Sequence, residues 1–464
     1  MSATDVANAT GGRITHGDAA AAIRGISIDS RALHAGDLFV AIKGDRFDGH
    51  DFVNDAVRAG AIGAMVHQAP AAPEAGTARP ALLIEVEDTT RALQDLAREV
   101  RRRSAAKVVA ITGSAGKTTT KEVAAEFLSA RFNVFRNKGN LNNHIGLPLS
   151  LLELRSRPDI AVVELGMNHA GEIRTLVGVA EPEIRVWTNV GDAHLGFFES
   201  ADSVADAKAE ILENARPSDV LIANANDRRV LDRVHGFGGR LVTFGIETDA
   251  DVRATGVKHR GLEGVEADVT SSAGSAHLQT PLLGLGNLSN VLAAIAVGVQ
   301  FGLPLEEMVA RAGRLAPAYH RGELLRLPGG VTLIDDSYNS SPAALKRALE
   351  TVAHATGSAR KIAVLGEMLE LGAHAERLHR ECGRVAAESG LDLLIAVGGN
   401  PAKALANEAV ACGMSERSVL HVATKHDAAD TALRHVRPGD LVLVKGSRGI
   451  GTDLVVERLK GEFA

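Results

Sequence analysis

Aromatic residues and cysteines are scarce in this sequence. Phe, Trp and Tyr together make up 3% of the 464 residues, so the hydrophobic core is expected to consist of Ala, Val, Leu and Ile. The two cysteines, Cys382 and Cys412, belong to no CxxC pair and to no Cys/His cluster, which argues against both a disulfide framework and a zinc site. We therefore expect the protein to occupy a reducing compartment.

A sequence-wide positive charge and a membrane-length apolar run are also missing. Lys and Arg total 51 against 57 Asp and Glu, a net charge of −6, which argues against a basic surface for nucleic acid or anionic lipid. The most apolar stretch, 291–305, contains Gln300 and two glycines and is shorter than the roughly 18 to 20 apolar residues of a membrane span. We interpret it as a buried helix. The N-terminal residues lack the pattern of a secretory signal, so the expected location is the cytoplasm.

The length, about three times the ~150 residues of one domain, predicts two or three packed units. The Arg-rich segment 98–107 precedes an apolar strand over 108–112, which predicts a domain boundary near residue 105. We interpret Arg101 to Arg103 as a solvated helix end rather than a phosphate-binding patch. Upstream, the pattern predicts a small α/β unit, with strands over 37–43 and 81–87 and a helix over 53–61.

Strands and helices alternate beyond residue 107. Such alternation predicts βαβ units and a parallel sheet. Pro317 and a polar cluster interrupt the pattern near residues 315–321, and strands recur after them, which predicts a third, Rossmann-like domain. The fold class is therefore α/β, with predicted domains 1–105, 106–316 and 317–464.

The segment 112–120, TGSAGKTTT, stands between a predicted buried strand and a predicted helix. Glycines there let backbone N–H groups converge on phosphate oxygens, Lys117 can reach the β- and γ-phosphates, and the Thr118 hydroxyl can bind Mg²⁺. The common pattern has a glycine where this sequence has Ile111, so the loop is shorter than usual. The predicted ATP-binding residues of this phosphate loop are Gly113, Ser114, Ala115, Gly116, Lys117, Thr118 and Thr119.

This short loop, together with segments 137–148, 164–173, 335–339 and 365–372, resembles the Mur ligases, the ATP-dependent amide-bond synthetases of cell-wall precursor assembly. The resemblance covers about residues 27–448. It is greatest to the ligase that adds D-alanyl-D-alanine to UDP-N-acetylmuramoyl-tripeptide through an acyl phosphate. It implies that the first domain binds the UDP-linked substrate, that the central domain binds ATP and that the third is a Rossmann-like ligase domain, and we expect a monomer.

Other activities stay open at this point. One is a related ligase with another substrate, either the enzyme that adds the third peptide residue or folylpolyglutamate synthetase. The DNPR-type motif that the diaminopimelate-adding relative usually carries is absent from this sequence, which disfavours that option. Another is a P-loop NTPase acting as a switch, which would not need substrate motifs in the first and third domains.

Two magnesium ions are expected. Glu164 ends a predicted strand at the carboxyl edge of the sheet, where ligands bind in such folds, and with Thr118 it would hold the first ion. The resemblance implies that His194 and Lys208 serve the second. An ammonium offers no oxygen ligand, so Lys208 would need to be carbamylated. The alternatives are a strand-end carboxylate, a packed histidine and a solvated or salt-bridged lysine.

The nucleoside and γ-phosphate also have predicted partners. Asn287 and Asn290 share one helical face and could read adenine, although Asn287 could instead be a helix N-cap. The resemblance implies that Asp336 meets the ribose and that Arg321 reaches the γ-phosphate after domain closure. The predicted catalytic residues are Lys117, Arg321, Lys208 and His194.

The remaining predictions concern the substrates and follow from the resemblance. Turn-forming asparagines and solvent-facing basic residues are the competing interpretations. The residues expected to hold the uridine diphosphate are Ser30, Arg31, Asp48, Gly49 and His50; those expected at the muramoyl-peptide are Asn140, Asn142, Asn143, Asn168 and His169; those expected at the peptide carboxylates are Lys445, Ser447 and Arg448.

Overall fold

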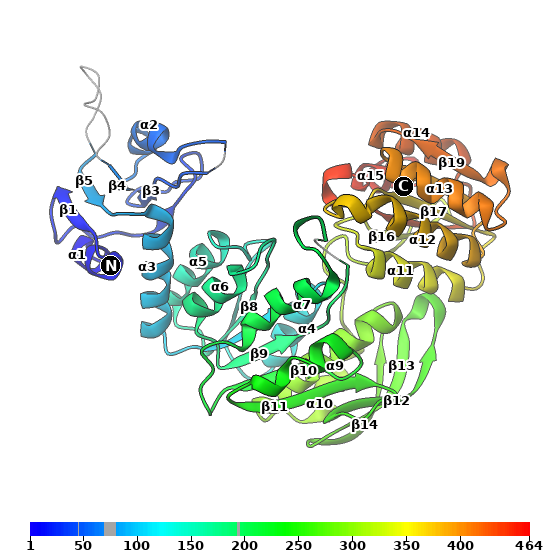
Figure 1. Cartoon of the computed structure of the whole chain (residues 1–464), viewed down its shortest axis with the longest axis horizontal. Coiled ribbons are helices and arrows are strands. Elements are labelled where there is room, and N and C mark those ends of the chain that lie inside the picture. The colour runs from blue at the N-terminus through cyan, green and yellow to red at the C-terminus, as the bar shows by residue number, and fades with distance from the viewer. Residues whose placement is uncertain (45, 69–79, 193–194) are drawn as a thin grey trace. The chain divides into compact units, whose positions relative to one another are not determined.

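The computed structural model describes residues 1–44, 46–68, 80–192 and 195–464. Its contacts divide the chain into two compact units. The first comprises Met1–Ala110, Phe132–Met167 and Gly171–Glu183, and the second comprises Ile111–Arg131, Asn168–Ala170 and Ile184–Ala464. Within the described ranges the strands form three sheets and helices accompany each of them, which confirms the α/β class (Figure 1).

The N-terminal sheet is parallel except for its first strand, which runs antiparallel to its neighbour. Its core is aliphatic apart from Phe39, as the scarcity of aromatics predicts. Asp88 caps the helix that leaves this sheet by accepting the N–H groups of Thr90 and Arg91. In sheet order the strands are β1 (Arg13–His16), β5 (Leu82–Glu85), β4 (Gly63–Val66), β3 (Leu38–Val40) and β2 (Ile26–Ser27); the helices are α1 (Ala3–Thr10), α2 (Val53–Arg58) and α3 (Thr89–Arg103).

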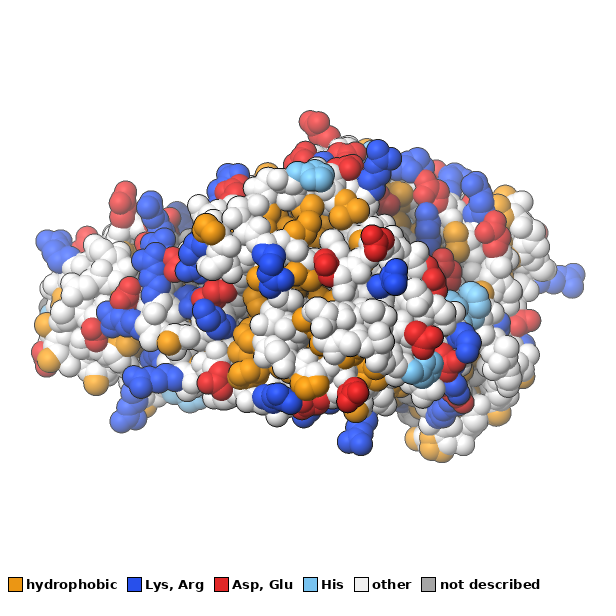
Figure 2. Space-filling view, turned by 90° about the horizontal axis from the view of Figure 1, so that it is seen from below, with side chains coloured by type: hydrophobic (Ala, Val, Ile, Leu, Met, Phe, Trp, Pro, Cys, Tyr) orange, Lys and Arg blue, Asp and Glu red, His pale blue; other side chains and the backbone are white. Residues whose placement is uncertain are grey.

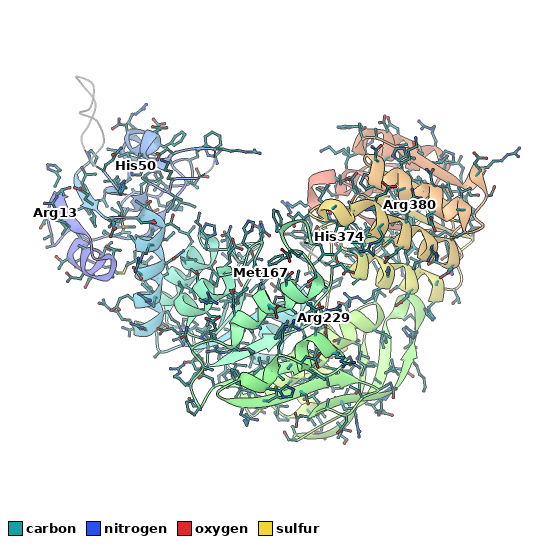
Figure 3. The ribbon with its side chains drawn as sticks, viewed as in Figure 1. Arg13, His50, Met167, Arg229, His374 and Arg380 are labelled. Carbon is teal, nitrogen blue, oxygen red and sulfur yellow. The ribbon has the colours of Figure 1, made fainter. Side chains whose placement is uncertain are left out.

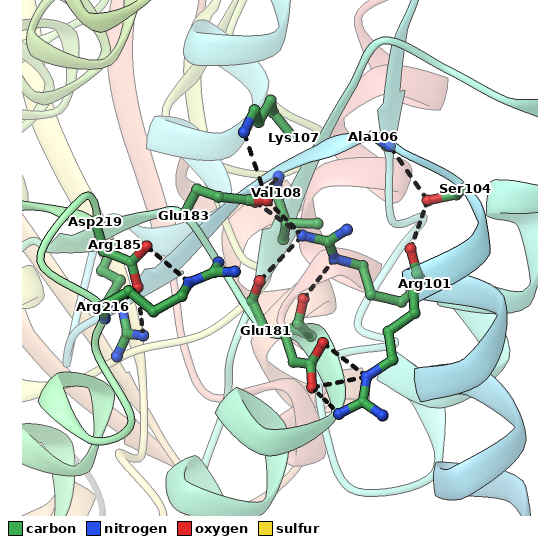
Figure 4. Close-up of polar contacts among 12 residues, drawn as sticks. Arg101, Ser104, Ala106, Lys107, Val108, Glu181, Glu183, Arg185, Arg216 and Asp219 are labelled. Atoms are coloured by element: carbon green, nitrogen blue, oxygen red, sulfur yellow. Dashed lines mark hydrogen bonds and ion pairs between the residues drawn. The ribbon is translucent and has the colours of Figure 1, made fainter.

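The solvated-helix-end interpretation is wrong for Arg101 at the end of α3, whereas Arg102 and Arg103 are exposed. Arg101 is buried, donates to the Ala180 and Glu181 carbonyls at the end of α6 (Glu172–Ala180), and forms a two-oxygen ion pair with Glu183 (Figure 4). Arg102 pairs with Glu181. A cation at a helix C-terminus satisfies its free carbonyls and interacts favourably with its dipole.

The central sheet is mixed rather than wholly parallel. Its order is β14-β13-β12-β11-β10-β9-β6-β8-β7. Strands β12 to β14 form an antiparallel meander, because residues 252–280 alternate in burial and turn tightly. The strands are β6 (Lys107–Thr112), β7 (Val134–Arg136), β8 (Ile160–Glu164), β9 (Ile184–Trp187), β10 (Val220–Asn224), β11 (Arg240–Ile246), β12 (Val252–His259), β13 (Val265–Ser271) and β14 (Gly274–Thr280).

The helices of this region include the predicted buried one. Residues 291–298 are all buried within α9, but α9 ends at Gln300 and a separate helix begins at Leu305. Its apolar run is therefore a core element. No helix among the described residues is long and apolar enough to cross a membrane. The helices are α4 (Lys117–Leu128), α5 (Gly146–Leu151), α7 (Ala201–Ala209), α8 (Arg228–Leu231), α9 (Gly284–Gln300) and α10 (Leu305–Ala312).

The C-terminal sheet is parallel apart from β15, which is antiparallel to β16. Helices α14 and α15 pack on its apolar strands to form one core. In sheet order the strands are β15 (Glu323–Arg326), β16 (Thr332–Asp336), β20 (Asp440–Lys445), β17 (Arg360–Gly366), β18 (Leu393–Val397) and β19 (Val419–Val422); the helices are α11 (Pro342–His354), α12 (Ala375–Glu388), α13 (Asn400–Ala411), α14 (Lys425–His435) and α15 (Asp453–Glu462).

Surface charges of both signs are interspersed. On the face drawn in Figure 2, Lys and Arg side chains alternate with Asp and Glu, and apolar side chains gather between them. This matches the small net charge of −6. Any site for a phosphate group must therefore be built locally.

Candidate nucleotide and ligase site

The phosphate loop joins β6 to α4, and its two glycines are required where they stand. Gly116 is the N-cap of α4 with φ of +83°, and a Cβ there would lie 2.2 Å from Asn290 Oδ1. Gly113 has φ of +148°, and a Cβ there would lie 2.0 Å from Thr188 Oγ1. A side chain at either position would meet both an unfavourable backbone conformation and a neighbouring polar group.

Residues that follow β9 hold the loop. Asn189 accepts the Ser114 N–H through its carbonyl at 3.0 Å, and its side-chain amide exchanges two hydrogen bonds with Ala115, at 2.9 and 3.0 Å. The Thr188 hydroxyl donates to the Ala115 carbonyl at 2.7 Å. Sequence reasoning missed Thr188 and Asn189, which directly follow β9 (Ile184–Trp187).

Lys117 begins α4 and folds back over the loop. Its Nζ donates to the Gly113 carbonyl at 2.7 Å. The ammonium therefore lies beside the N-terminus of a helix, where the helix dipole and free N–H groups also favour an anion. Ser114 to Thr119 are half-buried, which leaves this positive region open to a ligand.

The amide pair on α9 faces the phosphate loop. Helix α9 begins at Gly284 with Leu283 as its N-cap, so the N-cap alternative for Asn287 is wrong. The Asn287 amide donates to the Leu283 carbonyl at 2.9 Å, and Asn290 donates to Asn287 Oδ1 at 3.2 Å. Asn290 also accepts the Thr120 hydroxyl at 3.3 Å. The pair thus connects α9 to α4, and its contact with adenine stays a prediction.

In the first unit, an asparagine-rich loop folds over Glu164 at the end of β8. The buried Glu164 accepts the Asn142 amide at 2.8 Å, and its N–H donates to Asn137 Oδ1 at 3.1 Å. Asn143 accepts two N–H groups at the start of α5, as the turn interpretation predicts, and Asn140 is exposed. Their roles at the muramoyl-peptide stay predictions.

Of the two predicted ligands of the second metal ion, the structure describes Lys208 and not His194. Lys208, on α7, has only 1% of its surface exposed, so the solvated-lysine alternative is wrong. His194 lies outside the described residues. In the second unit, Asn168 and His169 are exposed, and the His169 ring meets Phe197 edge to face at 5.0 Å.

The predicted uridine-diphosphate segments are stabilised by their own carboxylates. Arg31 donates to both carboxylate oxygens of Asp29, at 2.9 and 2.8 Å, and this lowers the pKa of Asp29 to about 2. Arg31 itself remains exposed, next to the half-buried Ser30. This guanidinium therefore keeps an accessible face for a ligand.

His50, labelled in Figure 3, has partners at both of its ring nitrogens. Nδ1 contacts Asp48 Oδ1 at 2.6 Å, and Nε2 accepts the His67 N–H at 3.0 Å. A Cβ on Gly49 would lie 2.7 Å from the Ile42 backbone. His50 and Gly49 therefore have local structural roles, whatever their contact with a substrate.

The C-terminal residues predicted for ATP and for peptide carboxylates come together at one edge of the sheet. Lys445 Nζ donates to Asp336 Oδ2 at 2.6 Å and to the Asn339 carbonyl at 3.0 Å. Arg321 and Arg448 both lie over the ring of Tyr338. Ser447, next in sequence to Arg448, is buried, and its hydroxyl accepts the Leu369 N–H at 2.9 Å. Sequence reasoning missed Tyr338, although it lies in the segment 335–339 that carries the resemblance.

Comparison with known proteins agrees with this architecture. Three family models match the chain: the Mur ligase family catalytic domain at residues 22–101, the Mur ligase middle domain at 111–298, and the Mur ligase glutamate ligase domain at 320–448. The UDP-N-acetylmuramoyl-tripeptide--D-alanyl-D-alanine ligases of Bacillus subtilis (strain 168) and Escherichia coli (strain K12) are 34% and 35% identical, each over 94% of this chain and 93% of the relative.

Solved structures give the same result. The crystal structure I of MurF from Acinetobacter baumannii superposes with a TM-score of 0.89, at 31% identity, over 99% of this chain and 98% of that one. MurF ligase from Thermotoga maritima in complex with ADP superposes with a TM-score of 0.83, at 28% identity, over 95% and 98% of the two chains. This chain belongs to the Mur ligase family.

Proposed function

We propose that this chain is an ATP-dependent ligase that joins D-alanyl-D-alanine to UDP-N-acetylmuramoyl-tripeptide in peptidoglycan precursor synthesis. The observation that carries the proposal is the phosphate loop, with Lys117 and two obligatory glycines at the start of α4. Its setting supports the choice of reaction, because relatives named for that ligation are similar over more than nine tenths of the chain. ATP is the proposed nucleotide, as the ADP complex of a solved relative suggests.

The reaction needs activation because a carboxylate is a poor electrophile. An oxygen of the acceptor's terminal carboxylate attacks the γ-phosphorus of ATP, and ADP leaves. The dipeptide amine then attacks the carbonyl carbon of the acyl phosphate, loses a proton, and displaces phosphate. Lys117 and Arg321 neutralise the charge on the phosphoryl oxygens during transfer.

The donor set fits magnesium in its usual protein setting. Among the described residues, no group of three or more His, Cys, Asp or Glu side chains could hold a metal ion. Mg²⁺ is normally bound by one or two protein oxygens together with water and substrate phosphates. The Thr118 hydroxyl and the Glu164 carboxylate, which Asn142 orients, offer such oxygens. Mg²⁺ would neutralise charge on the phosphates.

Lys208 is proposed to carry a carbamate that serves a second magnesium ion with His194. Lys208 is buried rather than solvated, and its amine in the neutral form is the group that would react with CO₂. The carbamate replaces a cation by two carboxylate-like oxygens. Those oxygens are ligands that magnesium accepts.

The finer proposals follow from this reaction. The partners would be the UDP-linked tripeptide and D-alanyl-D-alanine, with the chain acting as a monomer. We place the reaction in the cytoplasm, where ATP and UDP-linked precursors occur. Folylpolyglutamate synthase from Mycobacterium tuberculosis superposes at 17% identity, a level that shows a shared fold and favours no shared substrate.

The test is phosphate release from ATP with defined UDP-N-acetylmuramoyl peptides. We expect release to require both the tripeptide and D-alanyl-D-alanine and to match the amount of pentapeptide product found by mass spectrometry. Release with UDP-N-acetylmuramoyl-dipeptide and a diamino acid would point to third-residue addition. Release that needs neither peptide nor amine would contradict the ligase and favour an NTPase switch.

A further inference from the structure

Two arginines that are distant in the sequence share one aromatic ring. The guanidinium carbon of Arg321 lies 4.2 Å from the ring centroid of Tyr338, and that of Arg448 lies 5.1 Å from it. Arg321 precedes β15, Tyr338 follows β16, and Arg448 follows β20. These three strands are neighbours in the C-terminal sheet, so the topology itself brings the three side chains together.

No carboxylate among the residues that the structure describes compensates the positive charge of this pair. Within the described part of the chain, neither guanidinium forms an ion pair or a side-chain hydrogen bond with a protein group. At the same sheet edge, the Asp336 carboxylate is bound to Lys445. Two cations near one ring repel each other, and a bound anion would relieve that repulsion. Guanidinium groups match the oxygens of phosphate and carboxylate groups.

Buried neighbours fix the backbone that carries the Tyr338 ring. The Tyr338 N–H donates to the His320 carbonyl at 3.1 Å. His320 Nδ1 contacts Asp335 Oδ2 at 2.5 Å, and the other oxygen of Asp335 accepts the Ser337 hydroxyl at 2.6 Å. His320, Asp335 and Ser337 are all buried. The backbone that carries Tyr338 therefore has a defined place, and cation–π attraction transmits it to the arginines.

We infer that Tyr338 is a positioning residue that holds Arg321 and Arg448 as one binding unit for a dianionic phosphoryl group. In the reaction this group is the phosphoryl group as it passes from ATP to the acceptor carboxylate, an identification that rests on the proposed function. Sequence reasoning assigned one arginine to the γ-phosphate and the other to peptide carboxylates. The γ-phosphate and the acceptor carboxylate become neighbours when the acyl phosphate forms. One ring that holds both arginines is consistent with that arrangement.

Binding of the anion can be tested without catalysis. The chain has two tyrosines, Tyr319 and Tyr338, so 3-fluorotyrosine labelling gives two ¹⁹F NMR signals, which Tyr319→Phe assigns. Inorganic phosphate, added at constant ionic strength against chloride, should shift the Tyr338 signal with saturation and leave the Tyr319 signal in place. Arg321→Gln and Arg448→Gln should each weaken that shift. A Tyr338 signal that phosphate and chloride move alike would overturn the anion site, even if the ligase reaction is confirmed.

Kinetics test the positioning role. Tyr338→Phe keeps the ring and should retain kcat within about threefold, whereas Tyr338→Leu should lower kcat roughly five- to thirty-fold, the effect of two cation–π contacts. The KM for D-alanyl-D-alanine should not change in either variant. Tyr319→Phe is the matched control, because Tyr319 is 73% exposed.

A double-mutant cycle separates positioning from folding. When both arginines are replaced by glutamine, adding Tyr338→Leu should cause no further loss, because the ring then has nothing to position. Thermal unfolding of each variant reports its stability independently. An undiminished loss in the double-arginine background, or a Tyr338→Phe variant as impaired as Tyr338→Leu, would overturn the positioning role.

Discussion

The phosphate loop and the C-terminal edge with Arg321 and Arg448 are held by different kinds of group. The loop is fixed by amide and hydroxyl groups of Ser114, Thr188 and Asn189. None of these groups changes charge near neutral pH, so the frame of the loop should be insensitive to pH and salt.

The C-terminal edge depends on charge instead. Lys445 is bound to Asp336, and His320 to Asp335. The comparison teaches that one chain can hold its phosphate loop in place with uncharged groups and its C-terminal edge with charged ones.

The largest loss of activity should come from replacing Lys117, the charged residue of the phosphate loop. Lys117→Ala should reduce phosphate release on the order of 10³-fold, because the ammonium acts on charge that develops in the transition state. The melting temperature should stay near that of the wild type, since Lys117 is half-buried at a helix start and is not a core residue. Lys460→Ala is the control, an exposed lysine that pairs with Glu457 on the same helix. Turnover near wild type would refute the loop assignment.

The second largest loss of activity is expected for Lys208. Its substitution tests whether activity also needs a charged group at a buried position outside the phosphate loop. Lys208→Ala should lower turnover on the order of 10²-fold if a carbamate supplies metal oxygens. Acetate or another small carboxylate should restore part of the activity. A salt bridge at the surface would have been worth only ~0–1 kcal/mol, and a packing role would not respond to acetate. Normal turnover across a magnesium titration, or a loss that no carboxylate relieves, would count against the carbamate.

Substitution of Gly116, which lies against Asn290, should have a smaller effect, and this effect should be on the stability of the fold. Gly116 and Gly171 are both helix N-caps with φ of +83° and +88°, but a Cβ at Gly171 would have nothing within 4 Å. Gly171→Ala should therefore cost about 1 kcal/mol of backbone strain alone. Gly116→Ala should cost about 1–3 kcal/mol more, because of overpacking against Asn290. Urea unfolding measures both. Equal losses would mean that Asn290 gives way easily.

The same comparison explains what could be predicted from the sequence. The loop was predictable because its glycines, lysine and helix are contiguous, and the α/β class followed from hydrophobic patterns. The contacts of Tyr338 with two arginines were not predictable, because they depend on which strands are neighbours in the sheet. The same holds for Arg101, whose partners Ala180 and Glu183 lie about 80 residues away. Lys208 differs from an ordinary surface lysine because it is buried. Local sequence patterns do not indicate whether a single polar residue is buried.

The smallest expected effect is a pH response confined to the charged region. His379 is fully buried; its Nε2 accepts the Met368 N–H at 2.9 Å, and its Nδ1 donates to the Ala375 carbonyl at 2.7 Å. The ring is therefore neutral, and burial lowers its pKa below the ordinary value of 6.5. It fixes Met368 in the segment that contacts Ser447, next to Arg448.

The sign of the pH effect follows from where the proton binds. As the pH falls below 6.5, the unfolded chain takes up a proton at this histidine before the folded chain does, so the contribution of His379 to stability is complete above pH 6.5 and declines below it. Between pH 7.5 and 5.5, the melting temperature of the wild type should therefore fall more than that of His379→Gln. The exposed His426→Gln serves as the control. Parallel curves for His379→Gln and the wild type would show that this charged frame is no more sensitive to acid than the neutral phosphate loop.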